Sequence, residues 1–165
     1  LQLYDTPSLL QPLRLMCLQL DWKKTDRNEW ADYTPEGLAS FEGDKKRNCV
    51  YLIWSEPENR MVYVGSGEVE RLWDHLCEND PQYRNIHSHP GLKATYALVD
   101  ARQMRGAESF LALGYHPAEG DRHPREFVKV TRPQNGVPFY SELYNNSISG
   151  LEMRYDVDAA NASSR

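Results

Sequence analysis

The chain has 165 residues, of which 40% are hydrophobic and 11% aromatic, so it can bury a sizeable core and is unlike a disordered, coiled-coil or collagen-like chain. No apolar run reaches the roughly 18 residues that a membrane span needs, and we expect no membrane partner. The formal net charge is −5 and no basic block is present, which argues against a strong, nonspecific nucleic-acid binder.

The number and spacing of the cysteines indicate a reducing compartment. Cys17, Cys49 and Cys77 are far apart and lie mostly in apolar runs, and none forms a CxxC motif or a Cys/His pair with zinc spacing. We expect buried thiols and a reducing compartment, so that the protein is cytoplasmic or nucleoid-associated.

The first segment, residues 1–47, is interpreted as an N-terminal extension. Within 13–22 the apolar pattern fits both a strand and a helix, and the choice stays open. Thr34 and Pro35 predict the start of a short helix, with Thr34 as its N-cap and Pro35 in its first turn. The charged run at 44–47 follows that helix.

The region 48–135 is interpreted as the main domain, and it begins with a predicted β-hairpin. Two apolar runs and the turn formers between them make up this hairpin: Cys49–Trp54, Ser55–Asn59 and Met61–Val64. A loop centred on Pro57 places Tyr51 directly opposite Tyr63, on one face of the sheet. The Gly-Ser-Gly sequence at 65–67 predicts the end of the second strand.

A helix is predicted over 68–78, directly after the hairpin. Its apolar stripe, with the spacing i, i+3, i+4 and i+7, consists of Val69, Leu72, Trp73 and Leu76. Arg71 and His75 are four residues apart and share a face beside this stripe. Because acidic residues occupy the same segment, an ordinary solvated surface is the alternative interpretation of that face.

Further elements are predicted before the C-terminal segment. They are a polar loop at 82–91, a strand at 94–99, a helix at 103–113 that ends at Gly114, and a short strand at 126–130. The C-terminal segment, 136–165, is expected to end in a disordered tail. Together the elements predict an α+β fold with a small central antiparallel sheet flanked by helices.

Glu108 is the unusual residue of the last helix, because its neighbours at helical spacing include Met104 and Leu111. A carboxylate within an apolar stripe is costly unless it is paired or bound to a metal. Alternatively, Glu108 lies at the edge of the stripe with its carboxylate in water.

These residues occur in a defined order: Cys49-Val50-Tyr51, Tyr63-Val64-Gly65, Arg71-Leu72-x-x-His75, Glu108, and Tyr115-His116-Pro117. The set resembles the GIY-YIG nuclease superfamily and covers about residues 48–120. Gly120 stands where relatives often have Asn. The resemblance implies a GIY-YIG-like fold and a metal-dependent endonuclease that hydrolyses phosphodiester bonds in DNA.

The resemblance also implies how the phosphate and the metal are held. Glu108 would bind a single divalent ion, Mg²⁺ or Mn²⁺, whose other ligands would be waters and phosphate oxygens. Arg71 would make charge-assisted contacts with the phosphate. Lys93, at the start of the third strand, is a further candidate for substrate binding.

Three other matched residues would act on the attacking water. Tyr51 resembles the family tyrosine that helps to deprotonate it, which requires positive charge nearby to lower a reference pKa of about 10. Tyr63 would orient the water or the phosphate. His75 would hydrogen-bond Tyr51 or the phosphate and could shuttle a proton.

Two other functions stay open. One is a GIY-YIG-like module with weak or no turnover that binds nucleic acid or a protein, which the acidic charge and Gly120 favour. The other is a protein unrelated to nucleic acid, whose hairpin register would separate Tyr51 from Tyr63, with Glu108 away from both. Because the chain is acidic, we expect weak autonomous DNA binding, assisted by a protein partner or a homodimer.

The histidines at 87, 89, 116 and 123 offer an alternative metal site, although scattered loop histidines are more typically exposed polar residues.

Overall fold

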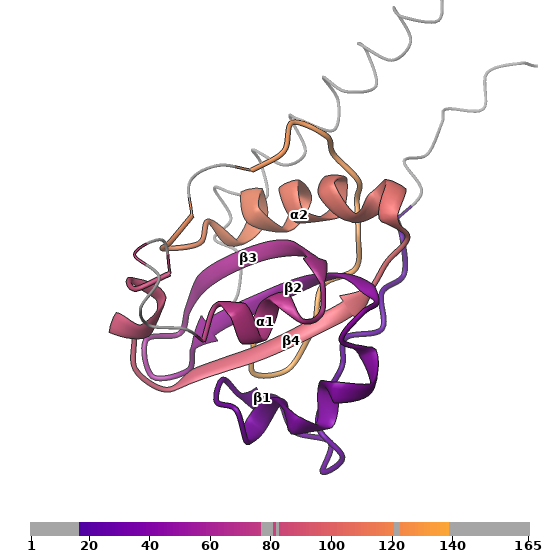
Figure 1. The fold of residues 1–165 in the computed structure, drawn as a ribbon. Coiled ribbons are helices and arrows are strands. Elements are labelled where there is room, and N and C mark those ends of the chain that lie inside the picture. Colours follow the sequence, from indigo (N-terminus) through magenta and orange to yellow (C-terminus); the bar gives the residue numbers. More distant parts are fainter. Residues whose placement is uncertain (1–16, 77–80, 82, 121–122, 139–165) are drawn as a thin grey trace, which may run out of the picture.

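The computed structural model describes residues 17–76, 81, 83–120 and 123–138. These residues form a four-stranded antiparallel sheet with the order β1-β4-β2-β3, as Figure 1 shows. Its strands are β1 (Ala31–Asp32), β2 (Asn48–Ser55), β3 (Arg60–Glu68) and β4 (Leu92–Leu98). The helices are α1 (Arg71–Asp74), α2 (Ala101–Tyr115) and the 3₁₀ helices η1 (Gly37–Asp44) and η2 (Ile86–Ser88). The predicted α+β class with a small antiparallel sheet is confirmed.

The sheet has a core on each face, and β2 contributes to both (Figure 1). The side chains of Cys49, Tyr51 and Ile53 join η1 and α1 in one core. Val50, Leu52 and Trp54 join α2 in the other. Successive strand residues point to opposite faces, so a central strand buried on both sides is apolar throughout. This explains the continuous apolar run in β2.

The register of the β2–β3 hairpin differs from the prediction. Tyr51 pairs with Gly65 in β3 and with Tyr96 in β4, whereas Tyr63 pairs with Ile53. The predicted pairing of Tyr51 directly with Tyr63 is therefore wrong by two residues. Because the side-chain period of a strand is two, this shift keeps both tyrosines on one face.

A β-bulge near the hairpin turn decides which face Tyr63 occupies. The pairs around it are Ser55–Arg60, Trp54–Met61 and Ile53–Tyr63. Val62 is thus the extra residue of β3, opposite no residue of β2. Continuing the register of the turn end without the bulge would place Tyr63 opposite Leu52, which points into the α2-side core. The bulge therefore places Tyr63 on the face of Tyr51.

The segment after the hairpin is more extended than predicted. β3 continues through Gly65 and Gly67 to Glu68, because β2 still pairs with it there. The predicted strand end at 65–67 and helix start at 68 are therefore wrong. α1 covers only Arg71–Asp74, and residues 77–80 lie outside the described part.

The ends of α2 also differ from the prediction. Asp100 caps its N-terminus by accepting a hydrogen bond from the backbone N–H of Arg102, at 2.9 Å. Gly114 does not end the helix, because α2 continues through it to Tyr115, and Gly114 is buried within the last turn. The helix ends at Tyr115, and His116 takes the left-handed conformation with φ +48°.

The N-terminal segment contributes to the same sheet. β1 pairs with β4, and Thr34, which precedes η1, accepts a hydrogen bond through Oγ1 from the N–H of Gly37, at 3.0 Å. The predicted Thr34 cap is wrong, because η1 begins at Gly37 and its N-cap is Glu36 without a side-chain cap hydrogen bond, and the helix is of the 3₁₀ type. Leu18 and Trp22 make only isolated bridges, and Leu18 pairs with Val130.

Several smaller predictions can now be compared with the structure. The predicted strand at 126–130 is wrong, because only Val130 makes a bridge there. Cys49 is a buried thiol as expected, whereas Cys17 is exposed, which corrects the expectation for it. Cys77 and the tail at 156–165 lie outside the described residues. No helix in the described part has the length and apolarity to cross a bilayer.

Candidate functional site

Tyr51 lies at the centre of a buried group of aromatic rings. Its Oη is 2.5 Å from Nε2 of His75, and its ring stacks on that of Tyr63 with centroids 6.1 Å apart. Tyr83 packs its ring edge-on against His75, with centroids 3.9 Å apart. Tyr51, Tyr63, His75 and Tyr83 are here called the tyrosine–histidine cluster. Three of the predicted site residues therefore belong to one contiguous group.

Two glycines of β3 create the space for this cluster. A Cβ on Gly65, which pairs with Tyr51 across the strands, would lie 2.4 Å from the Tyr51 Oη. Gly67 has φ +144° and lies against the side chain of Arg71, where a Cβ would be 3.1 Å from Cγ. The Gly-Ser-Gly sequence thus allows side chains to lie close to the strand rather than ending it.

Arg71 lies at the edge of the cluster, at the start of α1. It is exposed, and it hydrogen-bonds Tyr51 and, at 3.4 Å through Nη2, the hydroxyl of Tyr83. Its guanidinium has five N–H donors, so further donors are left for an anion. Arg71 therefore connects the buried phenols to the solvent.

The environment of Tyr51 does not favour a phenolate. Burial raises the pKa of Tyr51 well above its ordinary value, the neighbouring Tyr63 adds to this, and Arg71 acts in the opposite direction. Burial likewise raises the pKa of Tyr63, and the charge of Glu108 adds to that effect. Arg71 thus acts in the expected direction but is outweighed, and among the protein's own groups both phenols are neutral at neutral pH.

Glu108 is held by two partners at the edge of the sheet. Ser66 donates a hydrogen bond from Oγ to Oε2 at 2.5 Å, and Nδ1 of His123 lies 3.2 Å from Oε1. The Glu108 side chain is 13% exposed, so it is neither unpaired nor in open water. The carboxylate within an apolar stripe is therefore paired, as its cost requires.

A cavity of about 760 Å³ lies between Tyr63 and the segment that follows α2. Tyr63 and His123 both line it, so a ligand in this cavity could touch a member of the cluster and the partner of Glu108 at once. Glu108 lies on α2 and does not itself line this cavity, and Tyr51 points to the opposite face of the sheet. The edge strand β3 is where the two sides meet.

The segment after α2 lines this cavity. The backbone N–H groups of Ala118 and Glu119 donate to the carbonyls of Met61 and Val62, which adds the segment to the edge of β3. Gly120 follows with φ +78°, and a Cβ there would lie 3.0 Å from Cε2 of Tyr63. A glycine packed against Tyr63 therefore occupies the position that was compared above with the Asn of the GIY-YIG pattern.

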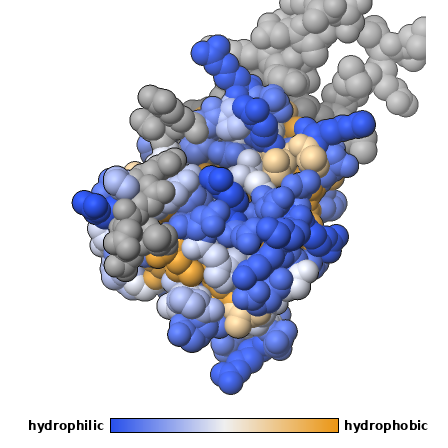
Figure 2. Space-filling model, in the orientation of Figure 1, coloured by the Kyte–Doolittle hydropathy of each residue, from blue (hydrophilic) through white to orange (hydrophobic). Residues whose placement is uncertain are grey.

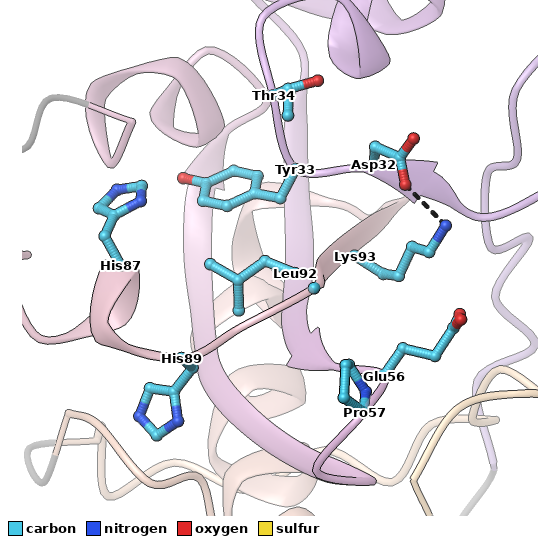
Figure 3. A pocket seen from close by; sticks show the side chains of 10 residues that line it. Asp32, Tyr33, Thr34, Glu56, Pro57, His87, His89, Leu92 and Lys93 are labelled. Atoms are coloured by element: carbon cyan, nitrogen blue, oxygen red, sulfur yellow. Dashed lines mark hydrogen bonds and ion pairs between the residues drawn. The ribbon is translucent and has the colours of Figure 1, made fainter.

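The structure does not bring Lys93 to this site. Lys93 pairs with Trp54, which belongs to the α2-side core, and its Nζ lies 2.7 Å from Oδ1 of Asp32. Both line a separate cavity of about 530 Å³, where Figure 3 shows Lys93 directed towards Asp32 and His87 beside the ring of Tyr33. The expected contact of Lys93 with the same phosphate is not supported by this placement.

The loop histidines are not gathered into one site. His89 bridges Glu58 and Glu119 at 2.7 and 3.2 Å, and His87 lies 2.7 Å through Nε2 from the carbonyl of His75. Within the described ranges, no group of three or more His, Cys, Asp or Glu side chains is placed to hold a metal. Of these histidines, His123 is the one that contacts a predicted metal ligand.

Sequence reasoning missed Tyr83 and Ser66. Tyr83 lies in a loop assigned as polar, where a large aromatic residue was a usable signal of packing. Ser66 had no such signal, because its contact with Glu108 depends on how α2 crosses β3.

No protein-family model, curated protein or solved structure matches the chain at a significant level. The functional argument therefore depends on the order of the residues and on their geometry.

Proposed function

We propose that the protein is a GIY-YIG-type endonuclease that hydrolyses phosphodiester bonds in DNA with a divalent metal. The observation that carries this proposal is the convergence of residues that are far apart in the sequence. Tyr51 contacts Tyr63, Arg71 and His75, and His123, a partner of Glu108, lines the cavity that Tyr63 also lines. Of the two signs expected of an accidental motif, Tyr51 and Tyr63 are not separated, because their rings stack, whereas Glu108 has Ser66 and His123 as its hydrogen-bond partners rather than either tyrosine.

The surroundings of Glu108 fit a divalent ion. Its Oε2 is held by Ser66, which orients the carboxylate, and Oε1 is directed towards the cavity wall at His123. Mg²⁺ characteristically binds through one or two carboxylates and keeps several waters. The ion would supply positive charge beside the scissile phosphate and the departing oxygen.

The protein's own groups would move the proton of the attacking water. Tyr51 accepts that proton as its hydroxyl proton passes to Nε2 of His75, 2.5 Å away, in the tautomer that leaves Nε2 unprotonated. This relay suits a phenol with a raised pKa, because no phenolate has to exist beforehand. Burial of both groups excludes competing water from the relay.

Arg71 and Tyr63 would hold the phosphate. The exposed guanidinium of Arg71 can donate two parallel hydrogen bonds to phosphate oxygens. Tyr63 is half-buried and borders the cavity, so its hydroxyl can orient a phosphate or a water without charge.

A second candidate function is a GIY-YIG-like binding module with weak or no turnover, for nucleic acid or a protein. It is favoured by the burial of Tyr51 and His75, which are 1% and 0% exposed, since water must reach Tyr51 for cleavage. On either proposal, the binding partner is DNA or another protein. The chain would act in the cytoplasm or nucleoid, either alone, with a protein partner or as a homodimer.

A plasmid-nicking assay at low salt tests the nuclease proposal. The full chain is compared with Glu108→Gln and Tyr51→Phe, each with Mg²⁺, Mn²⁺ or EDTA. Exposed Glu126→Gln is the matched charge control. We expect metal-dependent nicking that falls about 100-fold or more in both site variants and is unchanged in the control.

Other outcomes of this assay have defined meanings. DNA binding without nicking by the parent would favour the binding module. Nicking that persists in Glu108→Gln would contradict the assignment of the metal ligand.

A further inference from the structure

The ring of His123 is anchored through one nitrogen and directed to Glu108 through the other. Its Nε2 lies 3.0 Å from the carbonyl oxygen of Gly120, and its Nδ1 lies 3.2 Å from Oε1 of Glu108. A carbonyl oxygen only accepts hydrogen bonds, so Nε2 carries a proton. In a neutral imidazole, Nδ1 is then the nitrogen with the lone pair.

Two lone pairs that face each other need a positive group between or beside them. At Nδ1 of His123 and Oε1 of Glu108 this group is either a proton or a bound cation. Ligand atoms at adjacent corners of an octahedron with bonds of about 2.1 Å lie roughly 3 Å apart. The observed 3.2 Å is the distance of a hydrogen-bonded ion pair between the two side chains, and it is also close to the spacing of two ligands on one ion.

The hydrogen bonds that hold these two side chains are of the kind that orient metal ligands. Metal-binding imidazoles commonly donate their other N–H to a backbone carbonyl, as His123 does to Gly120. Ser66 similarly hydrogen-bonds the second oxygen of Glu108. The left-handed turn at Gly120, with φ +78°, directs that carbonyl at the ring.

We propose that His123 is a second protein ligand, through Nδ1, of the divalent ion at Glu108. This inference deepens the proposed nuclease function and depends on it for the presence of the ion. An imidazole nitrogen beside a carboxylate favours Mn²⁺ and later transition metals more than an all-oxygen site does. The site would therefore prefer Mn²⁺ over Mg²⁺.

The test measures binding of Mn²⁺ alone to the full chain by the loss of its free-ion paramagnetic resonance signal. The variants are His123→Ala, His123→Gln and Glu108→Gln, and the control is exposed His116→Asn from the same cavity wall. We expect Mn²⁺ affinity to fall about 10- to 100-fold in both His123 variants, and further in Glu108→Gln. The control should bind as the parent does.

A pulsed resonance experiment separates a ligand from a merely structural residue. The bound Mn²⁺ should show coupling to an imidazole ¹⁴N nucleus, and this coupling should vanish in His123→Gln and persist in His116→Asn. Circular dichroism and thermal melting identify any variant that fails to fold, and the two His123 variants serve as independent replacements.

The failure of this inference is distinguishable from the failure of the proposed function. Unchanged Mn²⁺ affinity in the His123 variants, absence of ¹⁴N coupling, or no binding by the parent would overturn the inference. Mn²⁺ binding with ¹⁴N coupling but no nicking would support His123 as a ligand and count against the nuclease. Nicking that needs Glu108, without ¹⁴N coupling, would support the nuclease and overturn His123 as a ligand.

Discussion

The hydroxyl of Tyr51 is surrounded by neighbours from two other parts of the fold. His75 and Arg71 come from the segment around α1, and Tyr63 stacks on its ring from β3. Burial keeps the phenol neutral, so its proton leaves only as another is taken up. At this residue the chemistry is therefore decided by desolvation more than by the cation beside it.

Gly65→Ala tests the close approach of Tyr51 to β3. The new methyl group would lie 2.4 Å from the Tyr51 Oη, so the ring must shift, and we expect a loss of about 1–3 kcal/mol in the free energy of unfolding. Gly43→Ala is the matched control, because nothing lies within 4 Å of its Cβ position. Urea denaturation measures both. Parent-like stability of Gly65→Ala would contradict the described position of Tyr51.

At the scale of elements, the edge strand β3 connects the two halves of the site. Its bulge places Tyr63 on the face of Tyr51, and its Ser66 holds Glu108 from the other face. The segment at 118–119 covers part of its edge with backbone hydrogen bonds. Bulges commonly redirect side chains beside active sites, which is the role this one would have.

His89 connects three of these elements and makes their association depend on pH. Burial lowers its pKa, but hydrogen bonds to Glu58 in the hairpin loop and to Glu119 after α2 outweigh this, and the net pKa is raised above 6.5. A group whose pKa is higher in the folded state than in the unfolded state stabilises the fold. This stabilisation is fully present below the unfolded-state pKa and is lost as pH rises through the folded-state pKa. The stabilising ion pairs are therefore strongest under mildly acidic conditions.

We expect His89→Gln to lose more stability at about pH 5.5 than at about pH 8, relative to the parent. Urea denaturation of both proteins at each pH measures the difference in unfolding free energy. An equal loss at both pH values would mean that His89 acts through packing rather than through its charge.

At the scale of the whole molecule, acidity and ion pairing limit contact with DNA. Five basic side chains of the described part are in ion pairs: Lys23–Asp21, Lys45–Glu42, Lys46–Glu70, Arg47–Asp44 and Lys93–Asp32. The face that Figure 2 displays is mostly hydrophilic, with small apolar areas between polar side chains. Binding to a polyanion at the proposed site would therefore depend mainly on exposed Arg71, which lies beside it.

The salt dependence of DNA binding tests this conclusion. With two or three phosphate contacts, affinity should fall roughly 10- to 40-fold between about 50 and about 200 mM salt. Arg71→Ala should weaken DNA binding and reduce the slope of log affinity against log salt concentration by about one. Exposed Arg102→Ala, on α2, should change both the affinity and this slope little. A steep slope that Arg71→Ala leaves unchanged would indicate that another surface binds the DNA.

The amino-acid sequence by itself determined the class of the fold and the identity of most candidate residues. The continuous apolar run of β2 and the periodic stripe of α2 are local patterns, and they predicted a buried strand and an amphipathic helix because burial acts on each side chain in turn. The order of Tyr51, Tyr63, Arg71, His75 and Glu108 was likewise readable without a structure.

Only the tertiary structure decided how these residues meet. The bulge at Val62, the continuation of β3 through its glycines and the placement of Lys93 away from the site depend on pairing between strands, which no local pattern specifies. The contacts of Glu108 with Ser66 and His123 join a helix, an edge strand and a loop. Such contacts arise from packing across long sequence separations, so they were decided by the fold as a whole and not by any segment of it.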